Sequence, residues 1–150
     1  MDPAIAHRLV LWDPAGSNAS EPRIFRADKP WRELLRIDDP SGDDKGRSGL
    51  LRYPDDPGWG ENRQGDIERI TVYRAGSALK VEVTLRSITR YWNPANGFDH
   101  VALTAFIEIP GKAGGSRIMP LQNAELPGDM TWHYRLRTHG WSNAWFGADG

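Results

Sequence analysis

The chain has 150 residues, which is enough for one domain with a real hydrophobic core and too few for two domains of ordinary size. Its 19 basic and 20 acidic residues nearly cancel and form no run of like charge, so no nucleic-acid partner is expected. The absence of cysteine excludes disulfides, thiolate metal sites and a cysteine nucleophile. No apolar stretch approaches the roughly 20 residues of a membrane span, so no membrane span is expected.

The part of the chain up to residue 37 is less clearly patterned than the rest. Residues 7–12 and 23–25 are each expected to form a short strand, because both stretches are locally apolar. Residues 30–37 carry a spacing that fits a helix, but only for a single turn. We therefore expect residues 1–37 to form N-terminal strands or a linker that packs on a module formed by residues 38–150.

The clearest strand signal lies between residues 69 and 86, where apolar and polar side chains alternate with a period of two. Residues 70–74 and 79–86 share this alternation, and the short connection between them contains Gly76, which suits a tight turn. The sequence therefore predicts an antiparallel hairpin with one face in the core. The apolar face of its second strand consists of Leu79, Val81, Val83 and Leu85.

Two more strands are predicted further along the chain. Residues 101–109 are apolar on one face and partly apolar on the other, which is typical of a central strand. Residues 130–137 alternate again, with Trp132 and Tyr134 on the side expected in the core. Seven Trp, 16 Gly and 11 Pro, with long connections between the strands, describe an all-β protein, and we expect an antiparallel β-sandwich.

Three stretches, taken in order, resemble a known family. They are residues 39–46 with the sequence DPSGDDKG, followed by Tyr53 and Pro54; residues 92–99, with WNPANGFD; and residues 139–141, with HGW. In this order they resemble the C-terminal binding-module domain of bacterial glucodextranases and amylopullulanases, which is similar to family 9 carbohydrate-binding modules. The resemblance covers about residues 38–145, and the DPSGDDKG stretch is its most specific part.

The resemblance implies a non-catalytic antiparallel β-sandwich in an extracytoplasmic protein, whether secreted, periplasmic or at the cell surface. Its partners would be a polysaccharide or oligosaccharide, with a glucan type favoured, and the other domains of a larger parent protein. Family domains continue for several strands beyond the position of residues 139–141, whereas here Trp145 and Phe146 already fall in the last ten residues. We therefore expect the sandwich to be truncated at its C-terminus.

The acidic stretch is a candidate calcium site. Four carboxylates fall within seven residues, namely Asp38, Asp39, Asp43 and Asp44. Ca²⁺ takes six to eight oxygen ligands at about 2.3–2.6 Å, and crowded carboxylates repel one another unless a cation offsets them. We expect Ca²⁺ to bind through some of these residues. The alternative is a solvated, turn-rich loop in which Arg47 and Arg52 supply the compensating charge.

Three tryptophans in predicted loops are candidates for carbohydrate binding: Trp59, Trp92 and Trp141. A pyranose ring has an apolar face of C–H groups and a polar rim, so a flat indole next to polar groups matches both. The alternative for each ring is that it closes one end of the sandwich as part of the core. Exposure of the rings distinguishes the two interpretations.

No catalytic motif stands out: the chain lacks a Gly-x-Ser-x-Gly elbow, a His-Glu-x-x-His pair and a phosphate-binding glycine loop. The expectation is a carbohydrate-binding accessory module and not an enzyme. The alternative is a calcium-stiffened structural or interaction domain with no glycan ligand.

Overall fold

The computed structural model describes residues 7–10, 29–46, 48–56, 63–76 and 78–148, and in these ranges all the paired strands are antiparallel and no helix occurs. The predicted antiparallel all-β fold class is confirmed. No helix of the described ranges is long and apolar enough to cross a membrane. The chain divides into two compact units, Met1–Ile88 and Thr89–Gly150, which are described one at a time.

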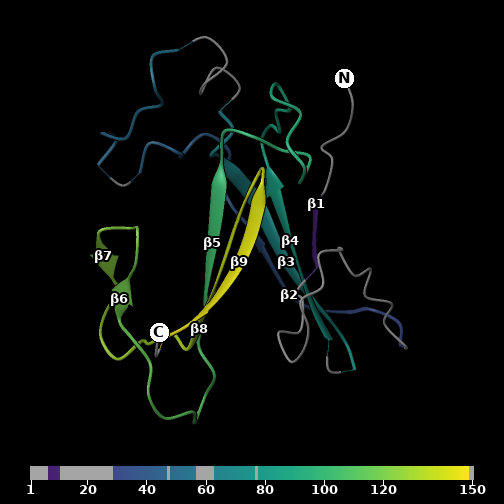
Figure 1. Ribbon diagram of the computed structural model, residues 1–150, viewed down its shortest axis with the longest axis vertical. Helices are drawn as coiled ribbons and strands as arrows, with labels where there is room; N and C mark the ends of the chain where they lie inside the picture. Colours follow the sequence, from purple (N-terminus) through teal and green to yellow (C-terminus); the bar gives the residue numbers. More distant parts are fainter. Residues whose placement is uncertain (1–6, 11–28, 47, 57–62, 77, 149–150) are drawn as a thin grey trace. The chain divides into compact units, whose positions relative to one another are not determined.

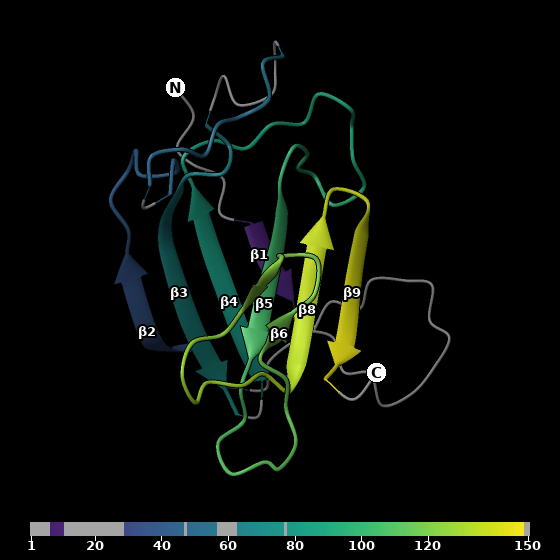
Figure 2. The same ribbon diagram turned by 90° about the vertical axis from the view of Figure 1, so that its left-hand side faces the viewer.

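The first unit is a four-stranded sheet with the strand order β1-β4-β3-β2 (Figure 2). The strands are β1 (His7–Val10), β2 (Arg32–Asp38), β3 (Ile67–Ala75) and β4 (Ala78–Leu85). β3 and β4 form the predicted hairpin, with Val72 opposite Val81. Gly76 in the connection has φ 61°, a left-handed conformation that glycine adopts without a steric cost. The hairpin prediction is confirmed.

The face of β4 predicted to lie in the core is buried unevenly. Leu85 is buried, Val81 and Val83 are half-buried, and Leu79 is exposed. Leu79 follows the turn directly, at the end of the hairpin, where fewer neighbouring side chains can cover it. Among the apolar residues of β4, burial is therefore deepest at Leu85, next to the start of β3, and Ala75 is buried at the other end of the hairpin.

The prediction of a helical turn at residues 30–37 is wrong, because β2 runs through most of them. β2 pairs with β3 from Arg32 opposite Arg74 to Asp38 opposite Arg69, with a register shift between Glu33 and Leu35. The backbone hydrogen bonds of this long pairing outweigh a helical preference that lasts only one turn. The boundary expected between the N-terminal segment, residues 1–37, and the module, residues 38–150, falls inside β2. This division of the chain stays a prediction.

The second unit is built on a three-stranded sheet with the order β5-β8-β9 (Figure 2), and its strands are labelled in Figure 1 as well. Its strands are β5 (Ala102–Ile107), β8 (Tyr134–His139) and β9 (Ser142–Gly147), and a small hairpin adds β6 (Ile118–Met119) and β7 (Ala124–Glu125). β8 begins later than predicted, because residues 130–133 pair with the sheet only in part. Trp132 instead makes an isolated bridge to Ser116. Its ring is buried as expected, and so is Leu136.

Candidate functional site

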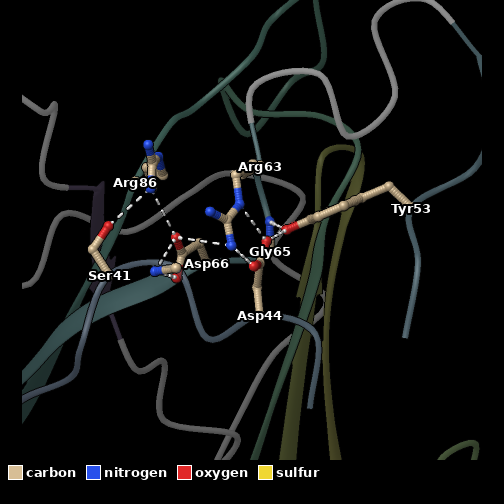
Figure 3. Close-up of polar contacts among 8 residues, drawn as sticks. Ser41, Asp44, Tyr53, Arg63, Gly65, Asp66 and Arg86 are labelled. Atoms are coloured by element: carbon tan, nitrogen blue, oxygen red, sulfur yellow. Dashed lines mark hydrogen bonds and ion pairs between the residues drawn. The ribbon is translucent and has the colours of Figure 1, made fainter. Parts of the chain in front are cut away.

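The acidic loop of the first unit is tied to the sheet by Asp66, which lies just before β3 (Figure 3). The Asp66 side chain is completely buried. Both of its carboxylate oxygens accept a hydrogen bond from the backbone amide of Gly42, at 3.1 and 2.9 Å. A buried carboxylate that accepts backbone N–H groups fixes the loop that carries them.

Two arginines compensate the buried carboxylates of this cluster. Arg86 Nη1 lies 3.5 Å from Asp66 Oδ2 and donates to Ser41 Oγ at 3.0 Å (Figure 3). Arg63 donates from Nε to Asp44 at 3.1 Å, forms an ion pair with it through Nη2, and places the same Nη2 3.9 Å from Asp66. A guanidinium shared between two acids offsets the repulsion expected for carboxylates at close range.

Tyr53 completes the cluster. Its hydroxyl donates to Asp44 and accepts from the backbone amide of Gly65 at 3.1 Å (Figure 3). Burial raises the pKa of the Tyr53 hydroxyl, so this group keeps its proton and remains a donor at neutral pH. The tyrosine of the Tyr53-Pro54 pair therefore joins the acidic loop on the inside of the unit.

The four aspartates predicted as calcium ligands are not equivalent. The Asp44 side chain is almost fully buried, whereas Asp39 and Asp43 are exposed. Asp38 is also exposed, and hydrogen bonds from Arg69 and Arg36 lower the pKa of its carboxyl group. Across the residues for which coordinates are described, no three Asp, Glu or His side chains gather in an arrangement that would hold a metal ion. The calcium site stays a prediction.

The counter-charges of the acidic loop also differ from those expected. Arg63, Arg69 and Arg86 provide them, from positions before β3, inside β3 and after β4. Arg52, one of the two arginines expected in this role, is exposed, and Arg47, the other, lies outside the described residues. The arginines that compensate the acidic loop are distant from it in sequence, and the folding of the β3–β4 hairpin brings them close to it.

A second buried aspartate, Asp99, organises the loop before β5 in the second unit. Its side chain is fully buried, and Oδ2 accepts the backbone amide of Trp92 at 2.9 Å. Oδ1 accepts from the Thr89 hydroxyl and from His100 Nδ1, which lies 2.7 Å away. Burial by itself raises the pKa of the Asp99 carboxyl, but these hydrogen bonds together outweigh it, and the pKa lies below its usual value.

Trp92 and Trp141, both predicted sugar-binding residues, come together in this unit. Their ring centroids are 6.1 Å apart, with 30° between the ring planes. About half of each residue is exposed, 53% for Trp92 and 52% for Trp141. The His100 ring lies 4.4 Å from the Trp92 ring. We call the two indoles, Trp92 and Trp141, the aromatic platform.

Close packing at Gly140, between β8 and Trp141, positions the aromatic platform. A Cβ atom at Gly140 would lie 2.4 Å from the carbonyl oxygen of Phe98 and 2.9 Å from Pro94 Cβ, so only glycine fits without a shift. Asn96 strengthens this contact by donating to the carbonyl oxygen of His139 at 2.6 Å. The loop that carries Trp92 is thus held against the turn that carries Trp141.

The other predicted tryptophan, Trp59, lies outside the described residues. Sequence reasoning did not assign Asp66 or Asp99 to either site. Asp99 lies inside the WNPANGFD stretch, so the resemblance contained a signal for it. Asp66 had no comparable signal, because its role depends on a contact 24 residues away in the chain.

The described residues thus define an antiparallel all-β protein with an exposed aromatic pair, which are the general features of a binding module. A family model described as the C-terminal binding module, SLH-like, of glucodextranase matches residues 34–149. The chain belongs to this family, and the predicted family resemblance is confirmed. The family is one of binding modules and not of catalytic domains, which supports a non-catalytic accessory role. Searches of curated proteins and of solved structures found no significant match.

Proposed function

We propose that the chain is a carbohydrate-binding accessory module of an extracytoplasmic polysaccharide-active protein, and that it binds a glucan-type chain on the aromatic platform. The observation that carries the proposal is the pairing of Trp92 and Trp141, both about half exposed, with centroids 6.1 Å apart. Large exposed rings are costly in water, and a sugar face of C–H groups matches them.

The spacing of the two rings favours a platform over a clamp. A sugar held between two parallel rings needs van der Waals contact on both faces, about 3.5–4 Å on each side, or roughly 7–8 Å in total. The observed 6.1 Å lies within the range of direct contact between aromatic rings. A chain would therefore lie across both indoles, and the shallow surface gives a Kd in the range of about 1 μM to 1 mM.

The side chains of Asn96 and Asn143, in the two segments that carry the aromatic platform, bind each other, and Asn96 also donates to the backbone carbonyl of His139. Asn143 Nδ2 donates to Asn96 Oδ1 at 3.2 Å, and Asn143 Oδ1 accepts from the Thr138 hydroxyl. These hydrogen bonds hold the two segments together, so the amides contribute to the position of the two rings.

A structural or interaction domain with no glycan ligand is the second candidate function. It is favoured by β2, on which Leu34, Leu35 and Ile37 are each about half exposed at one edge of the sheet. An apolar edge strand of this kind suits contact with another domain of a parent protein.

Titration calorimetry with malto-, isomalto-, cello- and xylo-oligosaccharides tests the proposal. We expect at least one series to bind, and Trp92→Ala and Trp141→Ala each to weaken binding at least tenfold while the protein stays folded. Trp31→Ala is the matched control, because Trp31 is a partly exposed tryptophan of the first unit. No binding to any series would favour the interaction domain, and binding that survives both platform variants would show that the glycan site lies elsewhere than on the aromatic platform.

A further inference from the structure

Arg135, on β8 of the second unit, is a buried cation that lacks a counter-ion. Only 7% of the residue is exposed, and its buried Nε has no hydrogen-bond partner. Nη1 donates to the carbonyl oxygen of Pro120 at 3.2 Å, and the guanidinium carbon lies 4.1 Å from the centre of the Phe146 ring. No described carboxylate forms an ion pair with Arg135. A buried guanidinium without an anion is unfavourable, and such a group points to a missing ligand.

Arg135 belongs to a row of basic side chains along the central strand of its sheet. Arg135, Arg137 and His139 are two residues apart in β8, so they lie on the same face of the sheet. We call these three residues the basic strip. Arg137 is half-buried, and the residues opposite it on the neighbouring strands, Thr104 and Ala144, have small side chains.

The far end of the basic strip reaches the aromatic platform. His139 is the last residue of β8, with Ala102 and Ser142, both small and exposed, opposite it in the sheet. The centroid of its ring lies 6.4 Å from the centroid of the Trp141 ring. A ligand that stacks on Trp141 and continues along the sheet would therefore meet His139 first and then Arg137.

The acidic side chains of the same unit do not neutralise the basic strip. Glu125, on β7, pairs with Arg117 at 3.5 Å. Glu108 accepts from the Thr131 hydroxyl at 3.1 Å, and Asp99 is buried with Thr89 and His100. In the described part of the chain, no ion pair involves Arg137 either. The charges of Arg135 and Arg137 are therefore not offset by an ion pair among the described residues, and Arg137 is the less buried of the two.

We propose that the basic strip binds the carboxylate groups of an acidic sugar chain whose rings stack on the aromatic platform. This inference rests on the proposed function and specifies the class of its ligand. The planar guanidinium of arginine matches a carboxylate in two-point hydrogen bonding, and a low-dielectric site strengthens the pairing. The basic strip has only two arginines, and the net charge of the chain is -1. This suits a glycan with few charges better than a nucleic acid, which carries a phosphate on every nucleotide.

The test compares malto- and cello-oligosaccharides with the same oligomers oxidised at C6 to uronates, by calorimetry at low ionic strength. The two ligands of each pair differ only in the carboxylate. We expect the oxidised form of at least one series to bind at least tenfold more tightly than the neutral form. Arg137→Gln should reduce this preference to threefold or less, and Arg137→Lys should restore part of it. Arg32→Gln, an exposed arginine of the first unit, should leave the preference unchanged.

Equal binding of oxidised and neutral oligomers would overturn the inference and leave the proposed function standing. A preference that survives Arg137→Gln would also overturn it, as would equally tight binding of a thymidylate oligomer of matched charge. Failure of every oligosaccharide to bind would overturn both proposals together.

Discussion

Each of the two units contains an aspartate whose side chain is completely buried, and each aspartate holds a loop by accepting a backbone amide. Asp66 accepts the amide of Gly42 and is neutralised by Arg63 and Arg86, which carry a permanent charge. Asp99 accepts a hydrogen bond from the backbone amide of Trp92, and its other hydrogen bonds come from the Thr89 hydroxyl and from His100. Both units thus use a buried carboxylate to hold a loop, but the side chains that interact with that carboxylate differ.

The difference lies in what each loop presents to solvent. The loop held by Asp66 directs Asp44 inward, toward Arg63 and Tyr53. The loop held by Asp99 directs the Trp92 ring outward, next to Trp141. A buried carboxylate can therefore serve stability alone or fix an exposed binding group, and the two cases are separable by mutation.

The largest expected effect is that of Asp66→Ala. The substitution removes the buried acceptor of the Gly42 amide and the carboxylate that Arg63 and Arg86 approach. Because both arginines stay partly exposed, the loss of the charge-assisted hydrogen bonds dominates and should cost about 3 kcal/mol. Denaturant unfolding in the presence of a chelator measures the loss. Asp39→Ala is the control, because Asp39 is exposed, and it should change stability by no more than about 0.5 kcal/mol. Equal effects of the two variants would contradict the structural role of Asp66.

Asp99→Asn should cost less, about 2 kcal/mol, because the side chain keeps its shape and one acceptor oxygen. The new amide NH₂ group would face the backbone amide of Trp92, two donors in contact, so the loop should move away from the aromatic platform. We expect weaker glycan binding together with the loss of stability. Asp66→Asn, in the other unit, should reduce stability without changing the affinity of the folded protein.

The pH dependence of Asp99 has a definite sign. Its folded pKa is lowered, so the native state binds fewer protons than the unfolded chain, and the stabilisation is fully present above the unfolded value of about 3.9. It is lost as the pH falls through the folded pKa. When thermal unfolding is measured at decreasing pH, the stability of the unsubstituted protein should fall toward that of the Asp99→Asn variant below about pH 4. A constant difference between the two proteins down to pH 2 would contradict this assignment.

The sequence predicted what depends on local pattern and missed what depends on distant partners. The β3–β4 hairpin was predictable because the strands are adjacent and alternate with a period of two. Trp92 and Trp141 were candidates because they lie in predicted loops, but the alternation pattern does not decide their exposure, and their pairing needs the contact between Gly140 and Phe98. The sequence predicts a helical turn where β2 lies, because only the pairing of this segment with β3 defines it as a strand.

Buried charge was the least predictable property. By alternation Arg135 belongs to the polar side of its strand, yet it is buried beside Phe146. Asp66 lies in a Gly-containing turn before β3, a typical place for an exposed acid. Period-two patterns report which face a residue occupies, but only the packing of distant segments decides whether that face is covered.

Gly140→Ala should have an intermediate effect, about 1–3 kcal/mol, since the added methyl group meets a backbone oxygen and Pro94. The shift needed to relieve the clash separates the loop of Trp92 from the turn of Trp141. We expect a changed near-UV circular dichroism signal and at least fivefold weaker glycan binding. Ser142→Ala, an exposed neighbour, is the control. Unchanged binding in a folded Gly140→Ala protein would show that the spacing of the two rings is not needed.

The smallest expected effect is that of calcium on the first unit. Arg63 approaches both buried acids, Asp44 and Asp66, and is itself partly exposed, so it can withdraw to water and leave two carboxylates to a cation. Extracellular calcium modules have Kd values of about 10⁻⁴–10⁻³ M, and at roughly 2 mM Ca²⁺ such a site adds about 1 kcal/mol to the free energy of unfolding. Melting curves with Ca²⁺ and with chelator measure this.

Two variants decide where a calcium effect originates. Asp44→Asn should abolish the rise in melting temperature, because it removes the charge of the buried acid in the loop. Asp99→Asn should keep the rise, since it alters only the second unit. Asp38→Ala should also keep most of it, because Asp38 faces Arg36 and Arg69 on the exposed side of β2. Melting curves that superimpose with and without Ca²⁺ would mean that arginines alone compensate the acidic loop. The two buried aspartates would then differ only in the charge of their protein partners.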